Sequence, residues 1–213
     1  MLQFNVLGFP VVVQWFFWLI MALMGGAIRA ETRDDWIDVA LWVIVGFVSI
    51  LVHELGHALA ARKFGYHSTI VLHGFGGVTI IPHARFSRGQ SIWVSFSGPL
   101  AGFLLAGITF ALALVIKTEY QAVRTLIGFS LFINIVWTLM NLLPVLPLDG
   151  GQILREILGP GRLQAACFIG GIVAVLVVAY AISERQIYLA FLFGYFAYIN
   201  FTNGHAEGGV IKG

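Results

Sequence analysis

Two histidines and a glutamate stand at a spacing that suits metal chemistry, in the segment His53-Glu54-Leu55-Gly56-His57. On a helix, residues four apart lie one turn apart on the same face, so both imidazoles can bind one Zn²⁺. Glu54 would lie beside such a metal without having to bind it. A carboxylate in that place can accept a proton from an attacking water. The spacing therefore predicts a hydrolytic zinc site with His53 and His57 as ligands and Glu54 as the base.

This motif ends a long apolar run that begins at Trp36. A charged group in hydrocarbon costs about 2.5–3.5 kcal/mol on insertion scales, so an ionisable cluster in an apolar helix is a functional site by default. Two other interpretations stay open at this point. The histidines could be a buried pair capped by polar partners, or they could belong to a polar patch that lines a pore.

A catalytic zinc needs a third protein ligand and an open position, and Asp149 is the candidate. The chain has three other aspartates, Asp34, Asp35 and Asp38, which cluster at a loop and helix start where acidic residues are ordinary. Asp149 follows Pro144 and Pro147, which interrupt a helix and can direct a carboxylate into a helix bundle. The alternative is that Asp149 caps a short helix over Gly150–Leu158.

Composition places the chain in a lipid bilayer as an α-helical polytopic membrane protein. It is 59% hydrophobic and 10% charged, whereas soluble domains carry about 25% charged residues. Its cations form no basic run, so we expect no nucleic-acid partner. About six segments are apolar and long enough to be transmembrane helices: 9–28, 37–61, 91–116, 123–146, 164–182 and 187–203. We interpret the apolar residues 1–28 as a retained membrane helix rather than a cleaved signal peptide.

The distribution of lysine and arginine predicts an orientation. With six spans, seven of these cations lie on the side that holds both termini and five lie on the other. Because cytoplasmic loops carry the excess of positive charge, we expect both termini in the cytoplasm and the metal site nearer that side.

A β-hairpin is predicted between the second and third spans. Two β-branched runs, Ser68–Leu72 and Val78–Ile81, flank the glycine-rich turn that contains Gly76 and Gly77. Such a hairpin near a membrane leaves an edge strand, which can pair with an extended peptide. A plain surface hairpin is the alternative.

Three motifs together resemble the site-2 protease family of intramembrane zinc metalloproteases: H-E-L-G-H at 53–57, S-G-P-L at 97–100 and N-L-L-P-V-L-P-L-D-G-G at 141–151. The resemblance implies that His53, His57 and Asp149 bind zinc and that Glu54 is the general base. It also implies that the hairpin, with Gly76, Gly77 and Val78, pairs with an unfolded substrate segment. By the same resemblance Asn141 is a substrate-binding candidate, although an interhelical hydrogen bond would equally explain it.

The sequence thus predicts a single integral membrane peptidase domain over residues 1–213, with its core at 37–158. It would cleave transmembrane segments of membrane-protein substrates in a bacterial or archaeal cell membrane. We see no PDZ-like or other regulatory domain, so selection would rest on the membrane core, the hairpin or a regulatory partner. Two alternatives remain: a transporter or channel that uses the polar cluster as an ion site, and a catalytically inactive scaffold.

Overall fold

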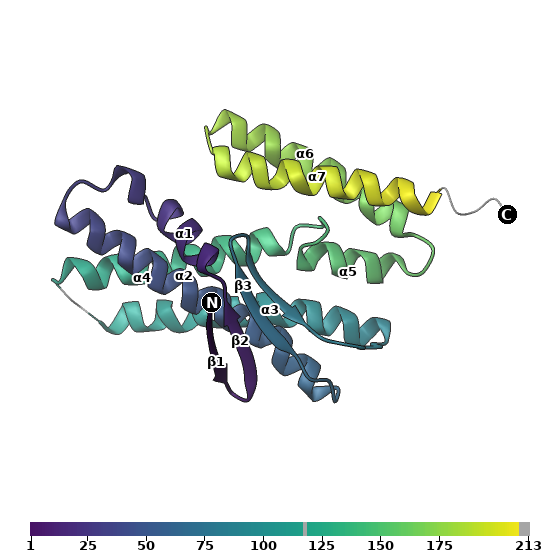
Figure 1. The fold of residues 1–213 in the computed structure, drawn as a ribbon, viewed down its shortest axis with the longest axis horizontal. Helices are drawn as coiled ribbons and strands as arrows, with labels where there is room; N and C mark the ends of the chain where they lie inside the picture. Colours follow the sequence, from purple (N-terminus) through teal and green to yellow (C-terminus); the bar gives the residue numbers. More distant parts are fainter. Residues whose placement is uncertain (117–118, 209–213) are drawn as a thin grey trace. The chain divides into compact units, whose positions relative to one another are not determined.

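The computed structural model describes residues 1–116 and 119–208, with side chains described as far as Thr202. Two cations from the orientation argument, Lys117 and Lys212, lie outside these residues. The chain folds as two compact units, one of residues 1–85 and 97–138 and the other of residues 86–96 and 139 onwards. The elements follow in the order β1 (Leu2–Val6), β2 (Phe9–Val13), α1 (Trp15–Met24), η1 (Ala27–Arg29), α2 (Arg33–Lys63), β3 (Thr69–His73), β4 (Gly76–Ile80), α3 (Arg88–Val115), α4 (Gln121–Asn141), α5 (Asp149–Leu158), α6 (Leu163–Ser183) and α7 (Ile187–Gly208) (Figure 1).

Within the described residues, four helices are long and apolar enough to cross a membrane: α2, α3, α4 and α6. The helix α1 and the apolar part of α7, Ile187–Thr202, are shorter. The predicted helix over 9–28 is wrong for its first part, because Phe9–Val13 is the strand β2 and α1 begins at Trp15. The β-branched run Val11–Val13 pairs there with strands on both sides, as β-branched residues favour. The count of six spans stays a prediction.

The strands form one four-stranded sheet in the order β1-β2-β3-β4. Strands β3 and β4 are antiparallel, with Val71 opposite Val78. They differ by one or two residues at their ends from the strands predicted at Ser68–Leu72 and Val78–Ile81. Strands β1 and β2, which the sequence analysis missed, form a second hairpin, and β2 runs parallel to β3. Among the described residues β4 is therefore an edge strand of the sheet.

The turn between β1 and β2 explains why the apolar N-terminal segment folds back as a hairpin. Leu7 and Gly8 both have positive φ, 50° and 85°. Two successive residues with positive φ make a tight turn whose twist matches antiparallel strands. The chain then returns along β1, with Val6 opposite Phe9.

The first unit is held by an apolar core between this sheet and helices α1 and α2. Alternate residues of β2 and β3 point into it, as the strand period requires. The buried members are Phe9, Val11, Val13, Phe17, Met21, Ile50, Ala58, Ile70 and Leu72. The sheet is thereby fixed against the helix that carries the histidine motif.

Helix α2 begins with a capping box, which accounts for two of the clustered acidic residues. Thr32 Oγ1 accepts a hydrogen bond from the Asp35 N–H, and Asp35 Oδ2 accepts one from the Thr32 N–H at 2.8 Å. Asp34 lies in the same first turn. These carboxylates stabilise the helix N-terminus, so the expectation that they are ordinary helix-start groups is confirmed.

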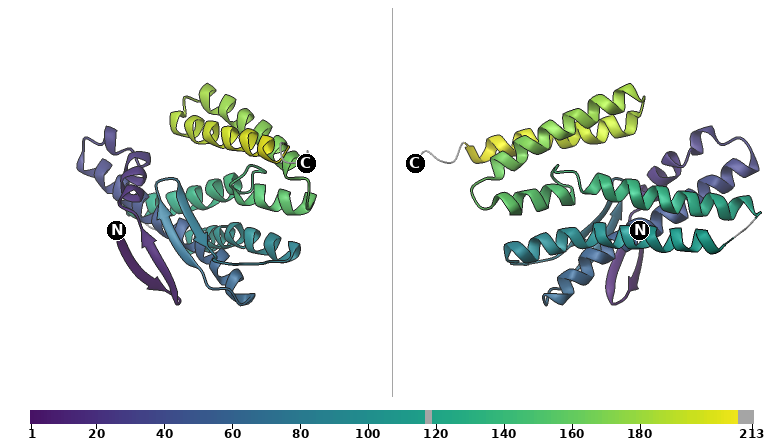
Figure 2. Two further views of the ribbon diagram at one scale, coloured as in Figure 1. Left: turned by 45° about the vertical axis from the view of Figure 1, so that its right-hand side comes forward. Right: turned by 180° about the vertical axis from the view of Figure 1, so that it is seen from behind.

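In the second unit, helices α6 and α7 lie side by side, as the views of Figure 2 show. Their contact is apolar and includes the fully buried side chains of Ala174 and Phe193 together with Val145. Val145 belongs to the segment between α4 and α5, so the α6–α7 pair also supports the segment that leads to Asp149.

Candidate metal centre and active site

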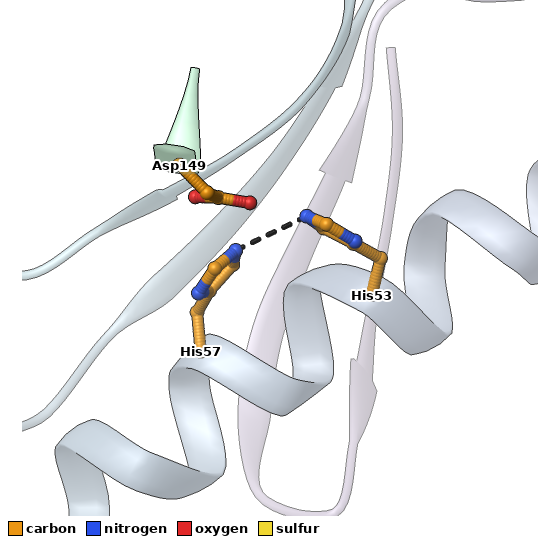
Figure 3. Close-up of side chains that lie close together, drawn as sticks. All are labelled: His53, His57 and Asp149. Carbon is orange, nitrogen blue, oxygen red and sulfur yellow. Dashed lines mark hydrogen bonds between the residues drawn. The ribbon is translucent and has the colours of Figure 1, made fainter. Parts of the chain in front are cut away.

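The two histidines of the motif present their ring nitrogens to each other from successive turns of α2 (Figure 3). Their Nε2 atoms are 3.2 Å apart, and both side chains are buried. Two nitrogens that bind one tetrahedral zinc at 2.0–2.1 Å are about 3.3 Å apart. The observed separation therefore fits a pair of zinc ligands.

Asp149 is the first residue of α5 and supplies the third group of this cluster (Figure 3). One ligand atom from each of His53, His57 and Asp149 lies within 4.8 Å of the other two. The alternative role of Asp149 as a helix cap is wrong, because Leu148 occupies the N-cap position. Two imidazoles and one carboxylate are a usual donor set for a catalytic zinc, which keeps a fourth position open.

The glycines after Asp149 hold its backbone tightly. A Cβ on Gly150 would clash with the Leu142 carbonyl oxygen, and one on Gly151 would lie 2.5 Å from the Leu146 nitrogen. Only glycine allows the start of α5 to pack so closely against the preceding segment. The D-G-G sequence thus places the carboxylate by backbone packing.

Glu54 is also buried, and a residue of the edge strand holds its carboxylate. Thr79 Oγ1 donates to Glu54 Oε2 at 2.7 Å and lies 3.1 Å from the Glu54 carbonyl oxygen. A Cβ on Gly77 would lie 2.5 Å from Glu54 Cγ. Residues two apart on a strand share a face, so Gly77 and Thr79 both face Glu54. Gly77 makes room for the carboxylate and Thr79 orients it.

The S-G-P-L motif lies directly against the histidines. A Cβ on Gly98 would clash with His57 Nε2 and would lie 2.8 Å from His53 Nε2. Where α2 meets α3, a Cβ on Gly56 would clash with the carbonyl oxygen of Ser97. Small residues let membrane helices approach this closely. Gly98 therefore leaves the space that the two imidazoles occupy, and Gly56 lets α2 approach the backbone of Ser97.

The remaining candidates occupy β4 and the end of α4. Gly76 has φ +125°, and a Cβ there would lie 2.8 Å from the Trp137 ring, so this position requires glycine. Val78 points away from the Glu54 face and is 41% exposed. Asn141 ends α4 and is half-buried. Its role toward substrate stays a prediction.

Asn134, which lies seven residues before Asn141 on α4, has a structural role. It is buried and donates through Nδ2 to Ser49 Oγ on α2 at 2.9 Å. Ser130 Oγ in turn lies 2.9 Å from Thr109 Oγ1 on α3. These hydrogen bonds join α4 to α3 and to α2, the helix that carries the histidine motif. Polar side chains commonly form such bonds between membrane helices.

His73 lies at the hairpin turn, and its Nδ1 accepts a hydrogen bond from the backbone. The Phe75 N–H donates to His73 Nδ1 at 3.2 Å, which requires an unprotonated acceptor nitrogen. Burial lowers the pKa of His73, and the charge of Glu54 acts in the opposite direction. The His73 side chain therefore supports the turn through this hydrogen bond, and burial favours its uncharged form.

Thr79 is a site residue that the sequence analysis missed. The signal was present, since Thr79 follows Gly77 by two residues on a predicted strand and so must share its face. The sequence pattern does not indicate which helix residue the Gly77–Thr79 face contacts, because that depends on how the sheet packs against the helices.

Comparison with known proteins agrees with this arrangement. Residues 41–121 and 117–182 match Peptidase family M50. The zinc metalloprotease MJ0392 of Methanocaldococcus jannaschii is 28% identical over 201 residues, covering 91% of this chain and 58% of that protein. The putative zinc metalloprotease Rip3 of Mycobacterium tuberculosis is 28% identical over 202 residues, covering 84% of this chain and 50% of that protein. The chain thus spans about half the length of these relatives.

A solved structure extends the likeness to the whole fold. The site-2 protease from Methanocaldococcus jannaschii has a TM-score of 0.66 and 25% sequence identity, and the alignment covers 100% of this chain and 97% of that one. The putative zinc metalloprotease YwhC of Bacillus subtilis is 33% identical over 154 residues, which are 69% of its length. On this evidence the chain is an integral membrane protein that belongs to Peptidase family M50.

Proposed function

We propose that this chain is an intramembrane zinc protease that cleaves transmembrane segments of membrane-protein substrates. The observation that carries the proposal is the cluster of His53, His57 and Asp149, whose ligand atoms lie within 4.8 Å of one another. Glu54 is adjacent to this cluster in sequence and buried with it. Membership of Peptidase family M50 supports a proteolytic use of this cluster over transport.

In the proposed site, His53, His57 and Asp149 would hold Zn²⁺. When bound, zinc would supply Lewis acidity toward the attacking water and the scissile carbonyl. The Nε2 atoms of the two buried imidazoles are already turned toward one another. Little rearrangement of α2 is then needed for binding.

Glu54 would move the protons of the reaction. Its carboxylate accepts a proton from the attacking water and returns it to the leaving amine of the cleaved peptide bond. Thr79 Oγ1 donates a hydrogen bond to Oε2 of this carboxylate. The hydroxyl of Thr79 is thus a positioning group for the base.

The edge strand β4 would align the substrate. A helical peptide bond is hydrogen-bonded within its helix, so a transmembrane substrate must unwind before attack. The outer edge of β4 can offset part of that cost by pairing with an extended segment. Gly76, Gly77 and Val78 would form the contact, and Asn141 would hydrogen-bond the substrate backbone. Glu54 lies directly beneath this strand, so a paired segment would run past the base.

We further propose the topology that the sequence predicts. Residues 1–213 would form one peptidase domain with its core at 37–158. Six membrane segments would leave both termini in the cytoplasm of a bacterial or archaeal cell and the metal site nearer that side. The four long apolar helices support the membrane-embedded core of this arrangement. A regulatory partner could select substrates.

The experiment compares wild type, Glu54→Gln and Asp149→Ala, purified in detergent, on a reporter transmembrane substrate. Wild type should bind about one zinc per chain and cleave. Glu54→Gln should keep zinc and lose at least about 100-fold in rate, since an amide cannot accept the proton. Asp149→Ala should lose most of the zinc.

Each result can contradict a separate part of the proposal. Wild-type cleavage by Glu54→Gln would exclude the proposed base. Full zinc retention by Asp149→Ala would remove that residue from the ligand set. Zinc uptake into vesicles by wild type, without cleavage, would favour the transporter alternative.

A further inference from the structure

A fully buried asparagine of the last helix holds the backbone of the segment that precedes Asp149. Asn200 on α7 donates through Nδ2 to the Leu146 carbonyl oxygen at 2.6 Å, and its Oδ1 accepts from the Leu146 N–H at 3.3 Å. The same Nδ2 donates to the Phe196 carbonyl oxygen at 2.8 Å. Asn200 thus engages both backbone groups of one residue in the segment between α4 and α5.

A glycine on the neighbouring helix makes this contact sterically available. A Cβ on Gly170 of α6 would lie 2.5 Å from Asn200 Oδ1 and 2.9 Å from the Pro144 carbonyl oxygen. Gly170 is therefore needed where α6, α7 and the segment meet. The space beside Gly170 holds the Asn200 side chain, and a larger residue at position 170 would not fit there.

Leu146 lies three residues before Asp149, and its nitrogen would lie 2.5 Å from a Cβ on Gly151. The backbone that Asn200 holds is thus the same backbone against which the start of α5 packs. A shift at Leu146 would be transmitted to Asp149 through rigid contacts, because the chain between them is short.

We propose that Asn200 is a positioning residue for the Asp149 ligand, which makes the last helix a part of the metal centre. The inference rests on the proposed role of Asp149 as a zinc ligand. Asn200 lies beyond the residues that match the family, which end at 182. Groups that orient a metal ligand from outside the ligand set typically contribute 10–100-fold to metal affinity.

The first test replaces Asn200 by the nearly isosteric aspartate. Asn200→Asp keeps the volume but removes both Nδ2 donations, because a carboxylate only accepts. We expect zinc affinity, measured by competition with a chelator, to fall 10–100-fold. We also expect a changed visible spectrum of the Co²⁺-loaded protein, which reports ligand geometry and which a remote stability defect would leave unaltered. A folded variant with wild-type affinity and spectrum would overturn the proposal.

Alanine substitutions at Gly170 and Gly194 supply a second test that leaves the side-chain amide of Asn200 unchanged. Gly170→Ala should produce the same loss, because the methyl would displace Asn200 or the Pro144 carbonyl. Gly194→Ala on α7 is the matched control, since no heavy atom lies within 4 Å of a Cβ there. Equal zinc affinity in both alanine variants would contradict the proposal.

A third measurement uses the wild-type protein, in case the variants do not fold. After removal of metal, hydrogen exchange at the Leu146 amide should stay slow, because Asn200 Oδ1 accepts its hydrogen bond whether or not zinc is bound. Rapid exchange that zinc suppresses would show that the metal organises the segment, and the inference would fail. The proposed function fails separately, if wild type binds no zinc or if Asp149→Ala binds it normally.

Discussion

Thr79 of the edge strand donates a hydrogen bond to the carboxylate of Glu54 on α2, with 2.7 Å between Oγ1 and Oε2. The bond links the surface proposed to receive the substrate directly to the group proposed to move the protons. Gly77 faces the same carboxylate, while Val78 between them points outward. One strand therefore presents alternate residues to the base and to the surroundings.

Removal of the Thr79 hydroxyl should slow cleavage without loss of metal. A hydrogen bond to a charged group contributes about 1.5–3 kcal/mol, which corresponds to about 10–100-fold in rate. We expect Thr79→Val, which keeps the side-chain shape, to lower kcat by that factor with zinc content unchanged. Thr79→Ser restores the hydroxyl and should recover most of the rate. Equal kcat values for wild type and Thr79→Val would show that Glu54 needs no such support.

A methyl group at Gly98 should disrupt the histidine pair. The added Cβ would occupy the space next to both Nε2 atoms, so at least one imidazole must turn away. We expect Gly98→Ala to lose about 10-fold or more in zinc affinity, measured by chelator competition. Gly107→Ala on the same helix is the matched control, because a Cβ there meets no atom within 4 Å. Similar affinities in the two variants would mean that the imidazoles do not need this space.

Proline in β4 should impair substrate processing at alternate positions. Proline removes a backbone donor and cannot extend a hydrogen-bonded ladder. A scan from Gly77 to Ile80 should reduce cleavage where the N–H points to the open edge, with zinc content unchanged. Gln3→Pro on β1, the other edge strand of the described sheet, is the control. Cleavage unaffected at every position would exclude strand pairing, and loss of folding at all of them would indicate a structural hairpin.

The lowered pKa of His73 should make the stability of the folded protein depend on pH. Burial lowers the pKa of His73 in the folded protein, so the unfolded chain binds its proton more readily. The contribution to stability is therefore present above the unfolded pKa of about 6.5 and is lost as pH falls through the folded value.

His73→Gln removes that titration, and the comparison isolates it. In metal-free protein, thermal unfolding of wild type and variant should differ most above pH 6.5 and converge as pH falls. All other titrating groups are common to the two proteins. A difference that stays constant between pH 5 and pH 8 would show that His73 does not contribute to the dependence.

The histidine pair could be predicted from the sequence because its geometry is local. Residues 53 and 57 are four apart, and the helix itself brings such residues onto one face. Their 3.2 Å nitrogen separation follows from that spacing together with rotamers that point the same way. Asp149 could be predicted as a candidate because a lone acid after two prolines in an apolar chain has few ordinary roles.

The segment Phe9–Val13 shows where a local pattern is insufficient. Its apolar residues fit a membrane helix or a buried strand equally well, since periodicity alone does not separate the two in short runs. This segment forms a strand because Val11 pairs with Ile70 and Val13 pairs with Leu72. Those partners lie almost sixty positions away in the sequence.

The residues that support the site could be identified only from the tertiary structure, for the same reason. Nothing in the spacing of Thr79 and Glu54, of Gly98 and His57, or of Asn200 and Leu146 indicates that each pair meets. The sequence by itself determined the chemistry, because ligand type and helical spacing are local properties. Only the packing of sheet and helices decided which side chains hold the base and which hold the backbone before Asp149, because those contacts join segments far apart in the chain.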